Sequence, residues 1–257
     1  MGTDPDELPV ACGREAAGLL GRLLGDELVA VWLTGSGALG GVAPGLSDVD
    51  VAAVTATDLP EDRRRALAAA LAELAMTWPL RGIEFVLYAR GALATPERRP
   101  RFAINLNVGP RMPYRLSLDP ATELAHWFLL DLGILRDHGR VLFGPPPREL
   151  VGPIPRRWLL EALRDSMAWH QANEPVLHQT VLNASRGWRF AAEGVWSSKR
   201  DAGAWAMART RDPATVETAL AIRYGDDSRP LDPAGVERFQ AEALAAVEEA
   251  LRDRPPG

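Results

Sequence analysis

Residues 31–54 have the sequence Val31-Trp-Leu-Thr-Gly35-Ser36-Gly-Ala-Leu-Gly-Gly-Val-Ala-Pro-Gly-Leu-Ser47-Asp48-Val-Asp50-Val-Ala-Ala-Val54. An apolar run that begins at Leu28 ends in Gly-Ser, and a second apolar run begins with two aspartates on either side of one valine. Short apolar runs bounded by glycine-rich turns are typical of buried strands. The stretch therefore predicts a strand, a tight turn, a short helix and a second strand.

The two aspartates predict a metal site. Because successive side chains of a strand point to opposite faces, Asp48 and Asp50 share a face. Two carboxylates about 7 Å apart repel each other unless a cation lies between them, and Mg²⁺ binds in this way, completing its shell with water and phosphate oxygens. Gly35 and Ser36 fall where the short helix would begin, and its free backbone N–H groups favour an anion such as a triphosphate.

The order of these features resembles the nucleotidyltransferase signature of the DNA polymerase beta superfamily. Gly35-Ser36 is followed by eleven residues, from Gly37 to Ser47, and then by Asp48-Val-Asp50 within an apolar run. The alternative is a surface turn with two solvated acids. The agreement of strand, Gly-Ser, spacer and second strand favours the nucleotidyltransferase interpretation.

The composition restricts the class of protein. With 257 residues, 47% of them hydrophobic and 25% charged, the chain can form one large or two small globular domains. Its single cysteine, Cys12, excludes an internal disulfide. The N-terminus is acidic and no apolar run reaches the length of about 18 residues that marks a membrane span, so we expect a cytoplasmic protein with no membrane partner. The net charge of −5 argues against a nucleic-acid partner.

Three helices and two more strands are expected before residue 143. The pattern predicts helices over residues 7–24, 58–76 and 121–137, a strand over 81–88, and a weaker strand over 102–108 followed by a loop. In the strand over 81–88, Glu84 is the one acid among apolar residues. A carboxylate in a buried strand is costly unless it pairs or binds something, so Glu84 either joins Asp48 and Asp50 or lies in water on an edge strand.

The proline-rich segment 143–155 marks a domain boundary, because it is stiff and cannot continue a helix. After it, helical periodicity continues over residues 156–171, 177–195, 202–209, 213–224 and 233–251. We expect a first domain over residues 1–152 and a C-terminal helical bundle over residues 153–257.

Further motifs resemble the streptomycin/spectinomycin adenylyltransferases over nearly the whole chain. They are Gly82-Ile-Glu84-Phe-Val86, Asp131 ahead of Leu135-Arg-Asp-His-Gly-Arg-Val-Leu-Phe-Gly-Pro145, Thr180-Val-Leu-Asn-Ala-Ser-Arg186-Gly-Trp188, and Gly194-Val-Trp-Ser-Ser-Lys199-Arg-Asp-Ala-Gly-Ala-Trp205-Ala206. The resemblance implies an α/β (α+β) architecture: a polymerase-beta-like domain with a small mixed sheet, followed by an all-α bundle. It also implies transfer of AMP from ATP, with Mg²⁺, to a hydroxyl of an aminoglycoside or aminocyclitol antibiotic.

The resemblance also implies roles for particular residues. Asp48 and Asp50 would hold the metal and Glu84 would be the general base. Nucleotide contacts would come from Gly35, Ser36, Ser47, Asp131, Arg186, Lys199 and Tyr224. Acceptor contacts would come from Asn107, Glu174 and Gln179, in two segments whose residues depart from the family's pattern.

Two other functions stay open at this stage. The same core could transfer AMP to a different acceptor, such as another antibiotic, a metabolite or a protein. The chain could also be a non-catalytic nucleotide-binding regulator, although such a protein has no need of a base like Glu84. We expect ATP and a small cationic acceptor as partners of a monomer.

Overall fold

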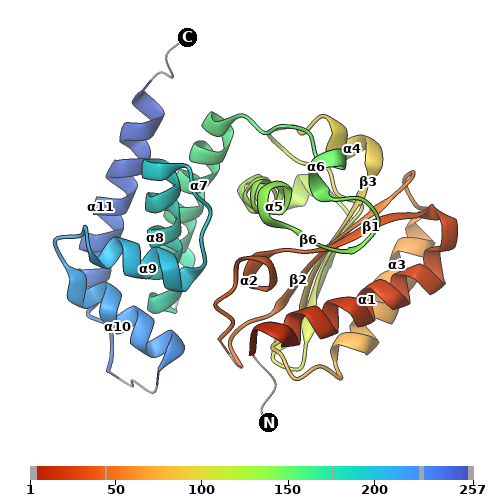
Figure 1. Cartoon of the computed structure of the whole chain (residues 1–257), viewed down its shortest axis with the longest axis horizontal. Coiled ribbons are helices and arrows are strands. Elements are labelled where there is room, and N and C mark those ends of the chain that lie inside the picture. The colour runs from red at the N-terminus through yellow and green to blue at the C-terminus, as the bar shows by residue number, and fades with distance from the viewer. Residues whose placement is uncertain (1–4, 44, 175, 226–228, 254–257) are drawn as a thin grey trace. The chain divides into compact units, whose positions relative to one another are not determined.

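The computed structural model describes residues 5–43, 45–174, 176–225 and 229–253, which form two compact units, Met1–Ile154 and Pro155–Gly257 (Figure 1). The expected domain boundary after residue 152 lies close to this division. The proline-rich segment is not purely a linker, because its residues Pro147–Leu150 form the short helix α6.

A six-stranded mixed sheet forms the centre of the first unit, in the order β5-β4-β3-β2-β1-β6. Strands β2 and β3 are parallel, and the other neighbouring pairs are antiparallel. The strands are β1 (Leu28–Leu33), β2 (Val49–Thr55), β3 (Ile83–Ala89), β4 (Ile104–Gly109), β5 (Met112–Ser117) and β6 (Arg140–Phe143). The expected α/β domain with a small mixed sheet is therefore confirmed.

Helices cover both faces of the sheet because its central strands are apolar on both sides (Figure 1). On one face lie α1 (Leu8–Leu24) and α3 (Glu61–Ala75), whose buried leucines share a core with Val31, Val51 and Phe85. On the other face lies α5 (Ala125–His138), which packs on Trp32 and Tyr88. Two short helices, α2 (Gly35–Leu39) and α4 (Arg90–Ala94), follow β1 and β3.

Both edge strands were missed by the sequence patterns. The proline and arginine residues after the strand predicted over residues 102–108 indicate a loop, but Met112-Pro-Tyr-Arg-Leu-Ser117 forms strand β5, which is largely exposed. Strand β6 has four residues and lies largely in solvent. Exposed edge strands lack the continuous apolar run that identifies a buried strand, and natural sheets often make them short and polar.

The second unit is helical, as expected. Its helices are α7 (Arg156–Asn173), α8 (Leu177–Glu193), α9 (Lys199–Met207), α10 (Pro213–Tyr224) and α11 (Pro233–Arg252). Helix α9 begins three residues earlier than predicted, because Ser198 caps it by accepting a hydrogen bond from the Asp201 backbone N–H.

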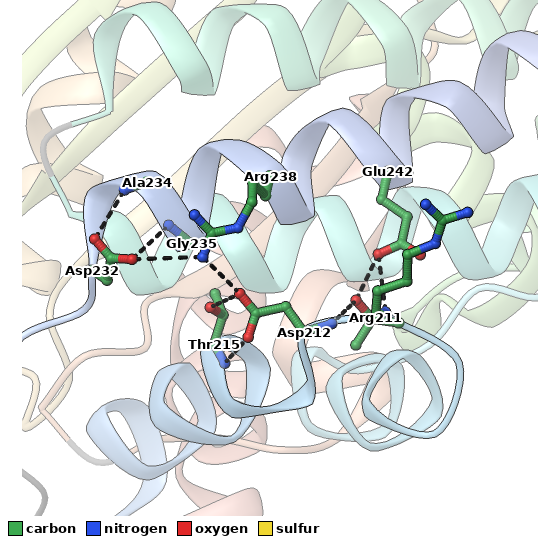
Figure 2. Close-up of polar contacts among 9 residues, drawn as sticks. Arg211, Asp212, Thr215, Asp232, Ala234, Gly235, Arg238 and Glu242 are labelled. Carbon is green, nitrogen blue, oxygen red and sulfur yellow. Dashed lines mark hydrogen bonds and ion pairs between the residues drawn. The ribbon is translucent and has the colours of Figure 1, made fainter.

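Figure 2 shows how the first turns of α10 and α11 are joined. The Asp212 side chain caps α10 through Thr215, and the Asp232 side chain caps α11 through the backbone N–H groups of Ala234 and Gly235. The Arg238 guanidinium lies 3.3 Å from Asp212 and 3.6 Å from Asp232, so one cation bridges both caps.

None of the helices in the described ranges is both long enough and apolar enough to cross a bilayer.

Candidate active site

The glycine-rich turn after β1 lies directly against β2. The Thr34 backbone N–H donates to the Asp50 carbonyl at 2.9 Å. Gly35 has a φ of +52°, and a Cβ at this position would overlap the Asp50 carboxylate. Both the backbone conformation and the close approach require glycine here. The predicted turn therefore places Gly35 and Ser36 beside one of the two predicted metal ligands.

Two hydroxyl groups of this turn are buried without a hydrogen-bond partner among the described residues. They are the Oγ1 of Thr34 and the Oγ of Ser36. A buried hydroxyl without a partner is costly, and such groups commonly await a ligand or water. Ser47 differs, because its Oγ accepts a hydrogen bond from the Ala43 backbone N–H and braces the loop before β2.

Three polar residues form a row across one face of the sheet. Asp50 on β2 is in register with Glu84 on β3, and Glu84 is in register with Asn107 on β4. Directly paired residues share a face, with Cβ atoms about 5 Å apart. The Oδ1 atom of Asn107 is buried and has no hydrogen-bond partner within the described ranges. Of the two alternatives left open for Glu84, the structure therefore supports the one in which it joins the aspartates.

Glu84 lies among several negative charges. Its pKa is raised well above the ordinary value, first by the charge of Asp48, then by burial, and then by Asp50 and Asp131, while Arg81 lowers it. Asp131 is an exposed residue of α5. Burial raises the pKa of Tyr88, and the charge of Asp131 raises it further. The structure thus brings Asp131 into the same electrostatic group as the three predicted catalytic carboxylates.

The donors in this group fit a magnesium ion bound together with a nucleotide. In the described part of the chain, no three His, Cys, Asp or Glu side chains are placed to form a complete metal site by themselves. Mg²⁺ does not need such a set, because one or two carboxylates suffice when phosphate oxygens and water complete the octahedron. The mutual repulsion that raises the pKa of Glu84 also shows an excess of negative charge, which a cation would relieve.

The remaining predicted site residues lie in the second unit. Arg186 on α8 donates from Nε to the Ser197 carbonyl at 3.1 Å. Lys199, the first residue of α9, donates from Nζ to Oε1 of Gln179 at 2.7 Å. Two predicted nucleotide contacts and one predicted acceptor contact therefore lie on α8 and the start of α9.

Positive charge gathers around these residues. The pKa of His178 is lowered to about 4 by burial and by the charges of Arg223 and Lys199. The Arg200 guanidinium lies 4.3 Å from the centre of the Tyr224 ring, and Tyr224 Oη is buried without a hydrogen-bond partner among the described residues. This surface suits an anionic ligand.

Glu174 directly follows the last residue of α7, and its side chain contacts the residue before α8. Its Oε1 accepts a hydrogen bond from the Val176 backbone N–H at 2.9 Å, and its Oε2 lies 3.8 Å from Nδ1 of His170. The carboxylate therefore has a structural role in the α7–α8 connection in addition to any contact with an acceptor.

Comparison with known proteins decides the family. The chain is 31% identical to an aminoglycoside (3'')(9) adenylyltransferase of Klebsiella pneumoniae over 208 residues, which are 76% of this chain and 77% of that protein. The chain belongs to the aminoglycoside adenylyltransferase family. It is therefore a nucleotidyltransferase.

Further similarities cover both units of this adenylyltransferase. A relative from Rhizobium radiobacter is 31% identical over 195 residues, which are 70% of this chain and 69% of that protein. The model of the aminoglycoside adenylyltransferase C-terminal domain matches residues 149–246. A crystal structure of a spectinomycin adenyltransferase from Enterococcus faecialis with ATP and spectinomycin matches with a TM-score of 0.76. The match covers 93% of this chain and 99% of the Enterococcus protein, at 16% sequence identity. The two proteins therefore share the fold.

In each unit of this adenylyltransferase, charged residues that the sequence patterns did not single out lie beside the predicted site residues. Arg81 forms an ion pair with Asp48, with 3.2 Å between Nη1 and Oδ2. The guanidinium groups of Arg200 and Arg223 lie 4.3 and 5.6 Å from the centre of the Tyr224 ring. The charge of Arg223 also acts on His178. The sequence contains one usable signal for Arg81, because this basic residue lies two positions before an apolar strand that carries a predicted catalytic acid.

Proposed function

We propose that the enzyme transfers AMP from ATP to a hydroxyl of an aminoglycoside or aminocyclitol antibiotic, releases pyrophosphate and thereby inactivates the drug. One observation carries this proposal. A carboxylate with a raised pKa, Glu84, lies in register between Asp50 and Asn107, whose buried carbonyl has no partner within the described ranges. A base between a metal ligand and a polar side chain suits transfer to a hydroxyl.

We assign the metal to Asp48 and Asp50. Bound there with the triphosphate, Mg²⁺ would neutralise charge that develops at the α-phosphorus and align the phosphate oxygens. Asp50 is fixed for this role by the hydrogen bond from Thr34 and by the close approach of Gly35. The excess negative charge around Glu84 supports the assignment.

Glu84 acts as the general base. A carboxylate oxygen of Glu84 takes the proton of the acceptor hydroxyl as the hydroxyl oxygen attacks the α-phosphorus, in line with the departing pyrophosphate. A raised pKa makes this carboxylate a better proton acceptor than an ordinary glutamate. Binding of a cation to the two aspartates would lower the pKa again, so that Glu84 is ionised when it is needed.

We assign nucleotide contacts to residues of each unit. In the first unit we assign Gly35, Ser36, Ser47 and Asp131, of which Ser36 has a buried hydroxyl that lacks a partner in the described structure. In the second unit we assign Arg186, Lys199 and Tyr224, and the cluster of positive charge around them supports a phosphate ligand.

The acceptor would contact Asn107, Glu174 and Gln179. Asn107 is the best supported of the three, because its buried Oδ1 can accept a hydrogen bond from a hydroxyl or amine close to the hydroxyl that reacts over Glu84. A cationic acceptor is also attracted by the carboxylates of the first unit.

Pyrophosphate release from ATP tests the proposal. The wild type and Glu84→Gln would be assayed with Mg²⁺ and a panel of aminoglycoside and aminocyclitol antibiotics, with mass spectrometry of the products. We expect one drug or more to gain a single AMP with the wild type, and a loss of about a hundredfold or more in Glu84→Gln. ATP turnover that no drug of the panel stimulates, or binding of ATP without turnover, would refute the proposed acceptor class.

A further inference from the structure

The Arg81 side chain forms an ion pair with one of the two predicted metal ligands. Its guanidinium Nη1 lies 3.2 Å from Oδ2 of Asp48, and the side chains of Arg81 and Asp48 are 36% and 20% exposed. Asp48 is one of the two predicted ligands of the metal. A cation of the protein itself is therefore in contact with one of the carboxylates proposed to receive Mg²⁺.

Backbone hydrogen bonds fix Arg81 at this position. Its N–H donates to the Ser47 carbonyl and its carbonyl accepts from the Arg111 N–H, both at 3.1 Å. The next residue, Gly82, accepts a hydrogen bond from the Val49 N–H at 2.9 Å. Arg81 is thus held beside the segment that carries Asp48, because parallel strands β2 and β3 begin at the same edge of the sheet.

The charge of Arg81 offsets the repulsion in the carboxylate group. Asp48, Asp50 and Asp131 act together on Glu84, and Arg81 opposes them. Without a cation, these carboxylates would repel one another at a site that is only partly solvated. A guanidinium also repels a divalent ion bound to the same carboxylate.

We propose that Arg81 is the resident counter-ion of Asp48 in the metal-free enzyme and that it competes with the divalent ion for this carboxylate. The enzyme therefore binds a free divalent ion weakly, and the negative charge of the triphosphate is needed to load the metal. Arg81 is a positioning residue that makes metal binding depend on the nucleotide. This inference rests on the proposed metal role of Asp48 and Asp50.

Direct titration with Mn²⁺, a paramagnetic substitute for Mg²⁺, tests the proposal without nucleotide, acceptor or turnover. Electron paramagnetic resonance would measure the dissociation constant for wild type, Arg81→Met, Arg81→Gln and Arg81→Lys. We expect Met and Gln to tighten Mn²⁺ binding about tenfold or more, because each removes a positive charge next to the metal. Lys keeps the charge and should stay within a few-fold of wild type.

Two controls keep the result specific. Arg148→Met removes another arginine–carboxylate pair of the same unit, that of Arg148 with Asp137 at 3.0 Å, and should leave Mn²⁺ affinity unchanged. Asp50→Asn added to Arg81→Gln should abolish the tight binding. Unchanged, weaker or undetectable Mn²⁺ binding in both Arg81→Met and Arg81→Gln would overturn the proposal, whereas pyrophosphate release by the wild type reports separately on the proposed function.

Discussion

Replacing Glu84 by glutamine should stabilise the metal-free enzyme against unfolding. In the presence of Mg²⁺ and ATP, the same substitution should remove most of the turnover. The substitution keeps the shape of the side chain but removes one negative charge from the group formed with Asp48, Asp50 and Asp131. Residues arranged for catalysis often cost stability in this way. The gain in stability should therefore appear in the variant that loses the base.

The size of the effect follows from the register. Asp50 and Glu84 are paired residues on neighbouring strands, and such pairs lie about 5 Å apart. Two unit charges at that distance repel by about 3 kcal/mol at an effective dielectric constant near 20. Because Glu84 is partly exposed and Arg81 offsets part of the repulsion, we expect the free energy of unfolding to rise by about 1–2 kcal/mol.

Urea unfolding in the presence of a metal chelator would measure this gain, and pyrophosphate release would measure the loss of turnover. The difference between wild type and Glu84→Gln should shrink when Mg²⁺ and ATP are added, because the bound cation relieves the same repulsion in the wild type. Glu73→Gln, at an exposed position of α3, is the matched control and should change neither quantity. Lower stability of Glu84→Gln in chelator would refute the electrostatic reasoning.

Three further substitutions test other parts of the structure. Gly35→Ala should reduce turnover by about a hundredfold or more, because the added Cβ would overlap the Asp50 carboxylate. Gly45 also has a positive φ but open space around it, so Gly45→Ala should cost about 1 kcal/mol of stability with little effect on turnover. Equal losses of turnover in the two variants would contradict this reasoning. The wild type should lose about 1 kcal/mol of stability relative to His178→Gln as the pH falls from 7 to 4. In that window the unfolded state protonates His178 before the folded state does, because burial and the charges of Arg223 and Lys199 lower its pKa to about 4 in the folded state. Parallel curves of stability against pH, measured by chemical denaturation, would exclude this contribution. Asp212→Ala should lower the free energy of unfolding by about 1–2 kcal/mol, because it removes the cap of α10. Asp212→Asn should cost much less, since its amide oxygen can still cap the helix. Equal melting temperatures of the two variants would show that the ion pair with Arg238 matters more than the cap.

The sequence alone determined the local elements that depend on neighbouring residues. The apolar runs around Gly35-Ser36 and Asp48-Val-Asp50 predicted β1, the short helix α2 and β2, and the structure contains all three. The helices of the second unit followed from their 3.6-residue periodicity, with bounds that differ by a few residues where a cap such as Ser198 extends a helix. The family could be inferred because its motifs are local as well.

Only the tertiary structure decided which residues meet across the sheet. The row of Asp50, Glu84 and Asn107 depends on the register of β2, β3 and β4, and a shift of one residue in any strand would turn its side chains to the other face. The pairing of Arg81 with Asp48 likewise requires two parallel strands that begin at the same edge. Strand pairing and burial bring together residues that are 23 to 34 positions apart in the chain, and no local pattern encodes such pairings. The chemical partners of the predicted acids could therefore be identified only in the folded chain.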